Sequence, residues 1–200
     1  MQRIRFIAAT VGWPGLVSFA SLFAAWTATA FLIFGNLRLA VASQICAFLL
    51  DSLDGFLARK LGVVSDFGRQ LDSMIDAFNY SLFAALLTML WLLPGALGFV
   101  VGFLILALGI LRLVLFNISG YVTEGDRLYY LGVVTPHLTL ASGLLFFAHK
   151  FWPIPDWAMA VVLVVLAFGQ LSKVRTRKTG ALAFWLPASV LLGIGALLWL

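Results

Sequence analysis

Five of the eight acidic residues of this chain fall in one stretch, residues 51–76, although apolar sequence surrounds it on both sides. Asp51 and Asp54 are three residues apart and Asp72 and Asp76 are four apart, so each pair projects from one face of a helix. An isolated carboxylate at membrane depth costs roughly 2.5–3.5 kcal/mol, so four of them need a partner. Divalent cations are such a partner, and all-oxygen ligation suits Mg²⁺ or Mn²⁺, with Ca²⁺ as an alternative.

Between the two acidic pairs, the sequence predicts the end of one helix and the start of the next. Arg59 and Lys60 followed by Gly62 are typical of a helix C-terminus, with Gly62 in the left-handed conformation. Ser65 or Asp66 is the expected N-cap of the second helix. The result is a helical hairpin whose arms each direct two carboxylates at a common space. Solvated charges in a loop are the alternative, but loop charges need no helical spacing.

Small residues accompany the acidic pairs and leave room for a ligand to approach the helices. Together with the aspartates they form one pattern: Asp51-x-x-Asp54-Gly55-x-x-Ala58-Arg59, eight residues, then Gly68-x-x-x-Asp72-x-x-x-Asp76. This pattern resembles the signature of the CDP-alcohol phosphotransferases at all eight of its positions.

The resemblance implies an integral membrane enzyme that cleaves CDP-diacylglycerol and transfers the phosphatidyl group to an alcohol. It implies two metal ions on Asp51, Asp54, Asp72 and Asp76, with Asp76 also the general base. The residues that it implies for nucleotide binding are Asp54, Gly55, Ala58, Arg59 and Gly68. It also implies a homodimer.

The composition is that of a membrane protein, because 63% of the 200 residues are hydrophobic and 10% are charged. We expect an all-α, polytopic transmembrane bundle of six to seven spans, formed by a single domain over residues 1–200 and starting with an N-terminal interfacial segment. The interfacial start is expected to be broken near Trp13-Pro14-Gly15, and the first span then runs to about Phe34. The others cover about residues 39–61, 67–92, from Pro94-Gly95 to 118, 130–147 and 157–171, with a seventh apolar run to residue 200.

The net charge of +5 does not indicate nucleic acid, since the basic residues are not clustered with stacking aromatics. They fit membrane topology instead. If the N-terminus is inside, eleven of the 13 basic residues face the cytoplasm, and Arg38 and Lys150 lie outside. We therefore expect a multi-pass protein of the cytoplasmic membrane, with the acidic hairpin facing the cytoplasm.

The acceptor alcohol is less strongly indicated. The segment 71–76 is similar to the corresponding segment of bacterial phosphatidylserine synthases, which makes serine the favoured acceptor. The residues around Tyr80 are similar to those of phosphatidylcholine synthases instead, so choline or another alcohol stays open. Glycerol phosphate is less favoured, because the enzymes that use it commonly have lysine where this chain has Ala77.

Arg112 lies in an apolar run, where a charge needs a partner. It either binds an anionic substrate group or extends to the interface. Because a serine carboxylate near four aspartates needs a cation, we expect Arg112, with Asn117, to bind the acceptor. A cation channel or carrier is the alternative from another class of protein, but transport requires none of the glycine, alanine and arginine positions of the signature.

Overall fold

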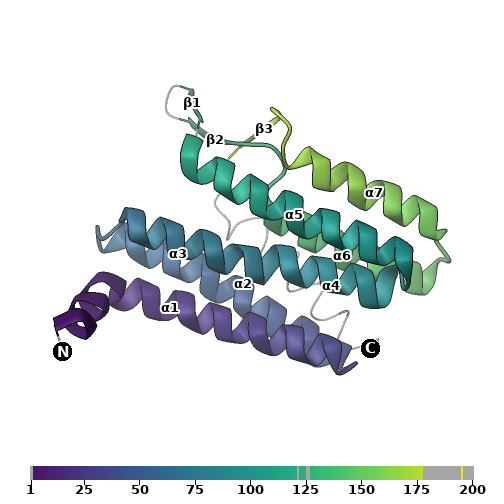
Figure 1. Cartoon of the computed structure of the whole chain (residues 1–200), viewed down its shortest axis with the longest axis horizontal. Helices are drawn as coiled ribbons and strands as arrows, with labels where there is room; N and C mark the ends of the chain where they lie inside the picture. The colour runs from purple at the N-terminus through teal and green to yellow at the C-terminus, as the bar shows by residue number, and fades with distance from the viewer. Residues whose placement is uncertain (1, 121, 125–126, 178–194, 196–200) are drawn as a thin grey trace.

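The computed structural model describes residues 2–120, 122–124, 127–177 and 195, and most of them are helical (Figure 1). The elements are α1 (Gln2–Ile33), α2 (Leu37–Lys60), α3 (Asp66–Asp76), the π-helical segment η1 (Ala77–Leu82), α4 (Phe83–Leu87), a second π segment η2 (Thr88–Leu92), α5 (Ala96–Ser119), β1 (Val122–Glu124), β2 (Arg127–Leu131), α6 (Thr135–Phe151), α7 (Asp156–Gly169) and β3 (Arg175–Arg177).

Four helical segments are long and apolar enough to cross a membrane: Gly12–Ile33, Leu37–Lys60, Asp66–Leu92 and Ala96–Ser119. The prediction of a helical membrane protein is confirmed at this level. Helices α6 and α7 are shorter, with 17 and 14 residues. The total of six to seven spans therefore stays a prediction, and most of the seventh apolar run lies outside the described residues.

The connection between α5 and α6 differs from the prediction. Three short antiparallel strands form a small sheet in the order β1-β2-β3, which the all-α prediction did not include. The span expected to start at residue 130 begins at Thr135 instead. Gly132, with φ of 76°, turns the chain out of β2, and Pro136 then fits the first turn of α6, where no backbone donor is needed.

The turn between α2 and α3 has the predicted form. Gly62 adopts φ of 67°, and the Val63 amide donates to the Ala58 carbonyl oxygen over 3.1 Å, which closes the end of α2. Ser65 is the N-cap of α3, since its Oγ accepts a hydrogen bond from the Gly68 amide over 3.1 Å. At the N-terminus, the backbone of α1 is kinked at Gly12. An interfacial position for the residues before this kink stays a prediction.

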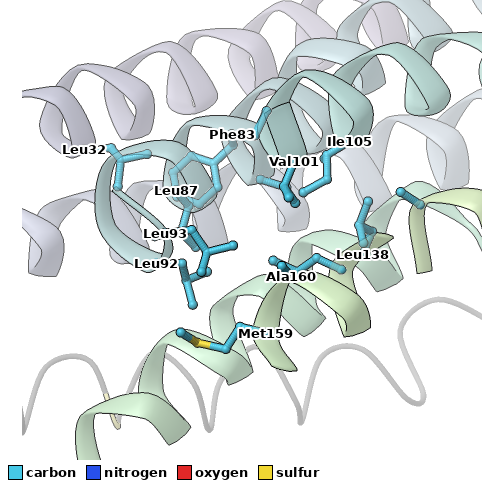
Figure 2. Packing of buried hydrophobic residues seen from close by; sticks show 14 of the residues in the cluster. Leu32, Phe83, Leu87, Leu92, Leu93, Val101, Ile105, Leu138, Met159 and Ala160 are labelled. Atoms are coloured by element: carbon cyan, nitrogen blue, oxygen red, sulfur yellow. The ribbon is translucent and has the colours of Figure 1, made fainter. Parts of the chain in front are cut away.

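The segment from α3 to η2 is the central helix of the bundle. Phe83 and Leu87 of α4 are buried in a core that Ile105 of α5, Leu138 of α6 and Met159 of α7 complete (Figure 2). Helix α5 approaches closely through glycine, because a Cβ at Gly102 would lie 2.9 Å from the Ala85 carbonyl oxygen. This packing fixes the position of α3 along the bundle axis relative to α5.

The two ends of the bundle differ in charge. The α2–α3 turn and the small sheet lie at one end, whereas the α1–α2 and α6–α7 connections lie at the other (Figure 1). The first end carries Arg59 and Lys60 in the last turn of α2 and Arg175 in β3. The opposite end carries Arg38 and Lys150. Which of the two ends faces the cytoplasm stays a prediction.

Candidate active site

The helical hairpin brings three of the predicted carboxylates together. Asp51 of α2 and Asp72 and Asp76 of α3 each offer one oxygen, and these oxygens lie within 4.8 Å of one another. The Asp51 and Asp76 carboxyl groups also interact directly. From the rise of a helix, Asp51 lies about 14 Å before the end of α2, well inside that helix.

Asp54 lies beside this cluster rather than within it. Its side chain is buried, and its charge acts on both Asp51 and Asp72. Ser18 of α1 and Arg59, one turn further along α2, interact with the Asp54 carboxylate. The four predicted aspartates are therefore neighbours, with three in a tight group and Asp54 toward the α2–α3 turn.

These carboxylates fit a hard divalent cation. Among the described residues, Asp51 Oδ1, Asp54 Oδ2 and Asp76 Oδ1 are buried oxygens without a hydrogen-bond partner. Burying such oxygens is costly, and the neighbouring negative charges repel one another. A cation bound among them removes both penalties, and carboxylate oxygens are the donors that Mg²⁺ and Mn²⁺ prefer.

Tyr80 of η1 is a contact of the cluster that the sequence analysis did not assign to the site. Its hydroxyl donates a hydrogen bond to Asp51 Oδ2 over 2.8 Å, and its side chain is buried. A signal was present in the sequence, because Asp72, Asp76 and Tyr80 follow one another at intervals of four residues. That spacing places all three on one helical face.

The π segment η1 offers backbone acceptors to neighbouring helices just beyond the cluster. Gln44 Nε2 of α2 donates to the Asn79 carbonyl oxygen over 2.6 Å, and Thr139 Oγ1 of α6 donates to the Tyr80 carbonyl oxygen over 3.0 Å. A π turn interrupts the regular α-helical hydrogen-bond ladder, and such turns are frequent at functional sites. Helices α2 and α6 are thereby both attached to η1.

The Asn79 side chain attaches a third helix. Its Nδ2 donates to Ser21 Oγ of α1 over 2.8 Å, and Ser21 Oγ donates to the Ala47 carbonyl oxygen of α2 over 2.9 Å. Both Asn79 and Ser21 are fully buried, so each bond replaces water that the side chains lost on folding. This network holds α1, α2 and η1 in register next to Asp51 and Asp76.

Arg112 of α5 is directed toward the cluster from the other side. The side chain is 5% exposed, and its charge acts on Asp76. Its guanidinium carbon lies 5.3 Å from the ring centroid of Phe116 and 5.8 Å from that of Tyr130. The predicted acceptor-binding cation is therefore buried within electrostatic reach of Asp76, and two aromatic faces pack against it.

Asn117, the second predicted acceptor residue, is hydrogen-bonded to a side chain of α3. Its Oδ1 accepts a hydrogen bond from Ser73 Oγ over 2.9 Å. This bond joins α5 to α3 at the residue next to Asp72. In the structure, Asn117 thus attaches α5 to the acidic arm α3 through Ser73.

The predicted nucleotide residues lie on the two arms between the carboxylates and the α2–α3 turn. A Cβ at Gly55 would lie 3.4 Å from Arg59 Nη1, so the guanidinium group covers this glycine. A Cβ at Gly68 would lie 3.3 Å from Ser65 Oγ, the N-cap of α3. Glycine at position 68 is therefore favoured for a structural reason as well, since a side chain there would crowd the Ser65 hydroxyl that caps α3.

An apolar groove leads away from the carboxylates on the side opposite the α2–α3 turn. It starts at Tyr80 and lies between α2 and α6, where Val41, Phe48, Leu140 and Gly143 are among its lining residues. Tyr80 thus has its hydroxyl at the acidic cluster and its ring in the groove.

Residues 12–171 match the family model described as CDP-alcohol phosphatidyltransferase. The chain is 32% identical over 125 residues to the archaetidylserine synthase of Methanothermobacter thermautotrophicus, which covers 59% of this chain and 52% of that protein. It is 28% identical over 165 residues to the CDP-diacylglycerol–serine O-phosphatidyltransferase of Bacillus subtilis, covering 81% of this chain and 88% of that protein. The protein of the same name from Mycobacterium leprae is 28% identical over 175 residues, with 82% and 58% covered. The chain thus spans little more than half the length of the first and third of these relatives.

Proposed function

Because the chain belongs to the CDP-alcohol phosphatidyltransferase family, we propose that it transfers the phosphatidyl group of CDP-diacylglycerol to L-serine, giving phosphatidylserine and CMP. The observation that carries this proposal is the approach of Asp51, Asp72 and Asp76 to within 4.8 Å, since all three stand at signature positions. The names of the Bacillus and Mycobacterium relatives support serine as the acceptor.

Asp51, Asp72, Asp76 and the adjacent Asp54 are the residues that would hold two divalent ions, Mg²⁺ or Mn²⁺. When bound, such ions neutralise the charge of the pyrophosphate and stabilise the departing CMP. Gly55, Ala58, Arg59 and Gly68, together with Asp54, face the nucleotide at the end of the hairpin. The exposed Arg59 adds a positive charge there, close to Asp54 and Asp72.

The lipid part of the substrate extends in the other direction. The apolar groove between α2 and α6 begins at Tyr80, directly beyond Asp51, so the reacting phosphate and an acyl chain can be bound at the same time. We assign the groove to one acyl chain of CDP-diacylglycerol, because its lining is almost entirely hydrocarbon.

Asp76 is the proton acceptor of the proposed reaction. Its Oδ1 is buried and has no hydrogen-bond partner among the described residues, so this carboxylate can accept a proton in addition to its proposed role in holding an ion. The serine oxygen forms a bond to the phosphorus of the diacylglycerol phosphate, the phosphoanhydride bond breaks, and CMP leaves with the bonding electrons. Arg112, whose charge reaches Asp76, binds the serine carboxylate and keeps the hydroxyl beside its base.

The aromatic faces near Arg112 favour serine over choline. A quaternary ammonium group is typically bound by aromatic rings, and Phe116 and Tyr130 are the rings that pack against Arg112, where the acceptor is proposed to bind. Their faces already pack against the Arg112 guanidinium group, at 5.3 Å and 5.8 Å. A choline cation would have to replace a buried arginine of the same charge.

The test is phosphatidyl transfer by the purified protein. CDP-diacylglycerol is supplied with serine, choline, glycerol 3-phosphate or inositol, with Mg²⁺, Mn²⁺ or a chelator, and both CMP and the lipid product are measured. We expect phosphatidylserine, and loss of CMP release with the chelator. Transfer to choline but not to serine would overturn the choice of acceptor. Cation flux in vesicles without any CMP release would favour the channel or carrier instead.

The location is part of the same proposal. We place the chain in the cytoplasmic membrane as a single domain, with the α2–α3 turn and the acidic hairpin facing the cytoplasm. The charge difference between the two ends of the bundle supports this orientation. The homodimer implied by the family resemblance is a further prediction, which cross-linking in native membranes would test.

A further inference from the structure

We propose that Tyr80 is a positioning residue of the metal site, whose hydroxyl holds the Asp51 carboxylate by one oxygen and leaves the other for the ion. The proposal rests on the proposed function, since it requires the aspartates to bind a divalent cation. It assigns to Tyr80 a role that lies outside the eight signature positions.

The two oxygens of Asp51 have different surroundings. Oδ2 accepts the hydrogen bond from the Tyr80 hydroxyl over 2.8 Å, whereas Oδ1 is buried without a hydrogen-bond partner among the described residues. A carboxylate that is held at one oxygen cannot rotate freely about its side-chain bond. The bond therefore leaves Oδ1 as the oxygen that is not held, in a carboxyl group that belongs to the cluster with Asp72 and Asp76.

Tyr80 is itself fixed from three sides, which a positioning role requires. Its carbonyl oxygen accepts from Thr139 of α6 over 3.0 Å, and the preceding carbonyl accepts from Gln44 of α2 over 2.6 Å. Its ring packs edge-on against Phe48, with 6.4 Å between the centroids and 73° between the planes. The side chain is 2% exposed, so water does not compete for the hydroxyl.

A purely structural explanation makes a different prediction. A buried phenol hydroxyl needs some acceptor, and under this explanation Asp51 Oδ2 is simply the nearest one. In that case, removal of the hydroxyl changes stability but leaves the affinity for the ion unchanged. If the bond orients Asp51, removal weakens metal binding, because outer hydrogen-bond partners of metal ligands typically contribute a factor of about 10–100 in affinity or activity.

The experiment is Tyr80→Phe in the full chain, which keeps the ring and its packing. Binding of Mn²⁺ to the purified protein is measured without substrates, by electron paramagnetic resonance of the free ion. We expect the dissociation constant to increase about tenfold. In the CMP-release assay, the Mn²⁺ concentration at half-maximal rate should rise by a similar factor, while saturating Mn²⁺ restores most of the turnover and the KM for serine is unchanged.

Tyr129→Phe is the matched control, because it removes a phenolic hydroxyl from β2, a strand that contributes none of the clustered carboxylates. An unchanged Mn²⁺ affinity of Tyr80→Phe, beside a wild-type protein that binds Mn²⁺, would overturn this inference alone. A wild-type protein that binds no Mn²⁺ would overturn the metal site and the inference with it. If Tyr80→Phe does not fold, Thr139→Val is used instead, because it removes the hydrogen bond that holds the Tyr80 carbonyl oxygen. An unchanged Mn²⁺ affinity of that variant overturns the inference.

Discussion

Arg112 Nη1 of α5 donates a hydrogen bond to Thr135 Oγ1, in the first turn of α6, over 3.2 Å. Thr135 is 1% exposed and Arg112 is 5% exposed, so the bond is protected from water. It fixes the guanidinium group between two helices, at a point where its charge reaches Asp76. A cation held in this way beside the proposed general base is in place for an anionic acceptor.

Arg112→Ala should raise the KM for serine by roughly tenfold or more, which is the scale of a lost charged hydrogen bond of about 1.5–3 kcal/mol. The KM for CDP-diacylglycerol should change much less, because the nucleotide is proposed to bind at the other end of the hairpin. Steady-state kinetics with each substrate varied in turn measure both values.

Arg69→Ala is the control for Arg112. Arg69 pairs with Asp66 on the exposed surface of α3, so its loss removes a positive charge without reaching the acidic cluster. An Arg112→Ala protein with the wild-type KM for serine would show that the acceptor carboxylate binds elsewhere.

The aspartates should not tolerate loss of charge. Asp51→Asn, Asp54→Asn and Asp72→Asn should each reduce CMP release by orders of magnitude, because an amide is a poor ligand for a hard cation. Membrane insertion should persist, as the change makes the helices less costly to insert. Asp66→Asn, at an exposed position outside the cluster, should keep its activity. Near-normal turnover of Asp51→Asn would disprove the proposed metal site.

The hairpin was predictable because its signals are local. Gly62 takes the left-handed conformation that the sequence predicted, and Ser65 is the N-cap. The four-residue spacing of Asp72 and Asp76 likewise predicted that their carboxyl groups project from one face of α3. These features depend on residues within one or two helical turns of each other, where spacing alone determines which side chains meet.

Other contacts of the site depend on packing between distant segments. The hydrogen bond of Tyr80 to Asp51 spans 29 positions, and that of Ser73 to Asn117 spans 44. No local rule indicates that Asn117 bonds to Ser73. The π segment η1 was not predicted either, because its carbonyl acceptors are used by Gln44 and Thr139 on other helices.

Orientation in the membrane can be tested by labelling single cysteines. Cys46 is exposed and is first replaced by alanine. Val64→Cys, in the α2–α3 turn, should then react with a membrane-impermeant reagent only from the cytoplasmic side. Phe34→Cys, in the turn before α2, should react only from outside. Both side chains are highly exposed, at 70% and 81%, so the substitutions should leave the packing unchanged.

Val64 is a better position for the cysteine than Gly62, which lies in the same turn. Gly62 has φ of 67°, a conformation that cysteine would adopt only with strain. Labelling of Val64→Cys from outside and of Phe34→Cys from the cytoplasm would reverse the proposed orientation and place the acidic hairpin on the other face.

The assignment of the apolar groove can be tested at Gly143 of α6. This glycine lines the groove, and a Cβ built there meets no atom within 4 Å, so Gly143→Leu would place its side chain in open space. Leucine is also a much better helix former than glycine, which is about 0.8–1.0 kcal/mol less favourable than alanine, so the fold should not be weakened. If an acyl chain occupies the groove, the new side chain displaces part of it.

Displacement of one or two methylene groups, at about 0.8 kcal/mol each, corresponds to a loss of about 4- to 15-fold in kcat/KM. We expect this loss with long-chain CDP-diacylglycerol and little change with a short-chain analogue that does not fill the groove. Val165→Phe adds bulk on the exposed face of α7, away from the groove lining, and should affect neither substrate. An equal loss with both chain lengths would mean that Gly143→Leu acts on the site through the fold, and the acyl assignment would then be wrong.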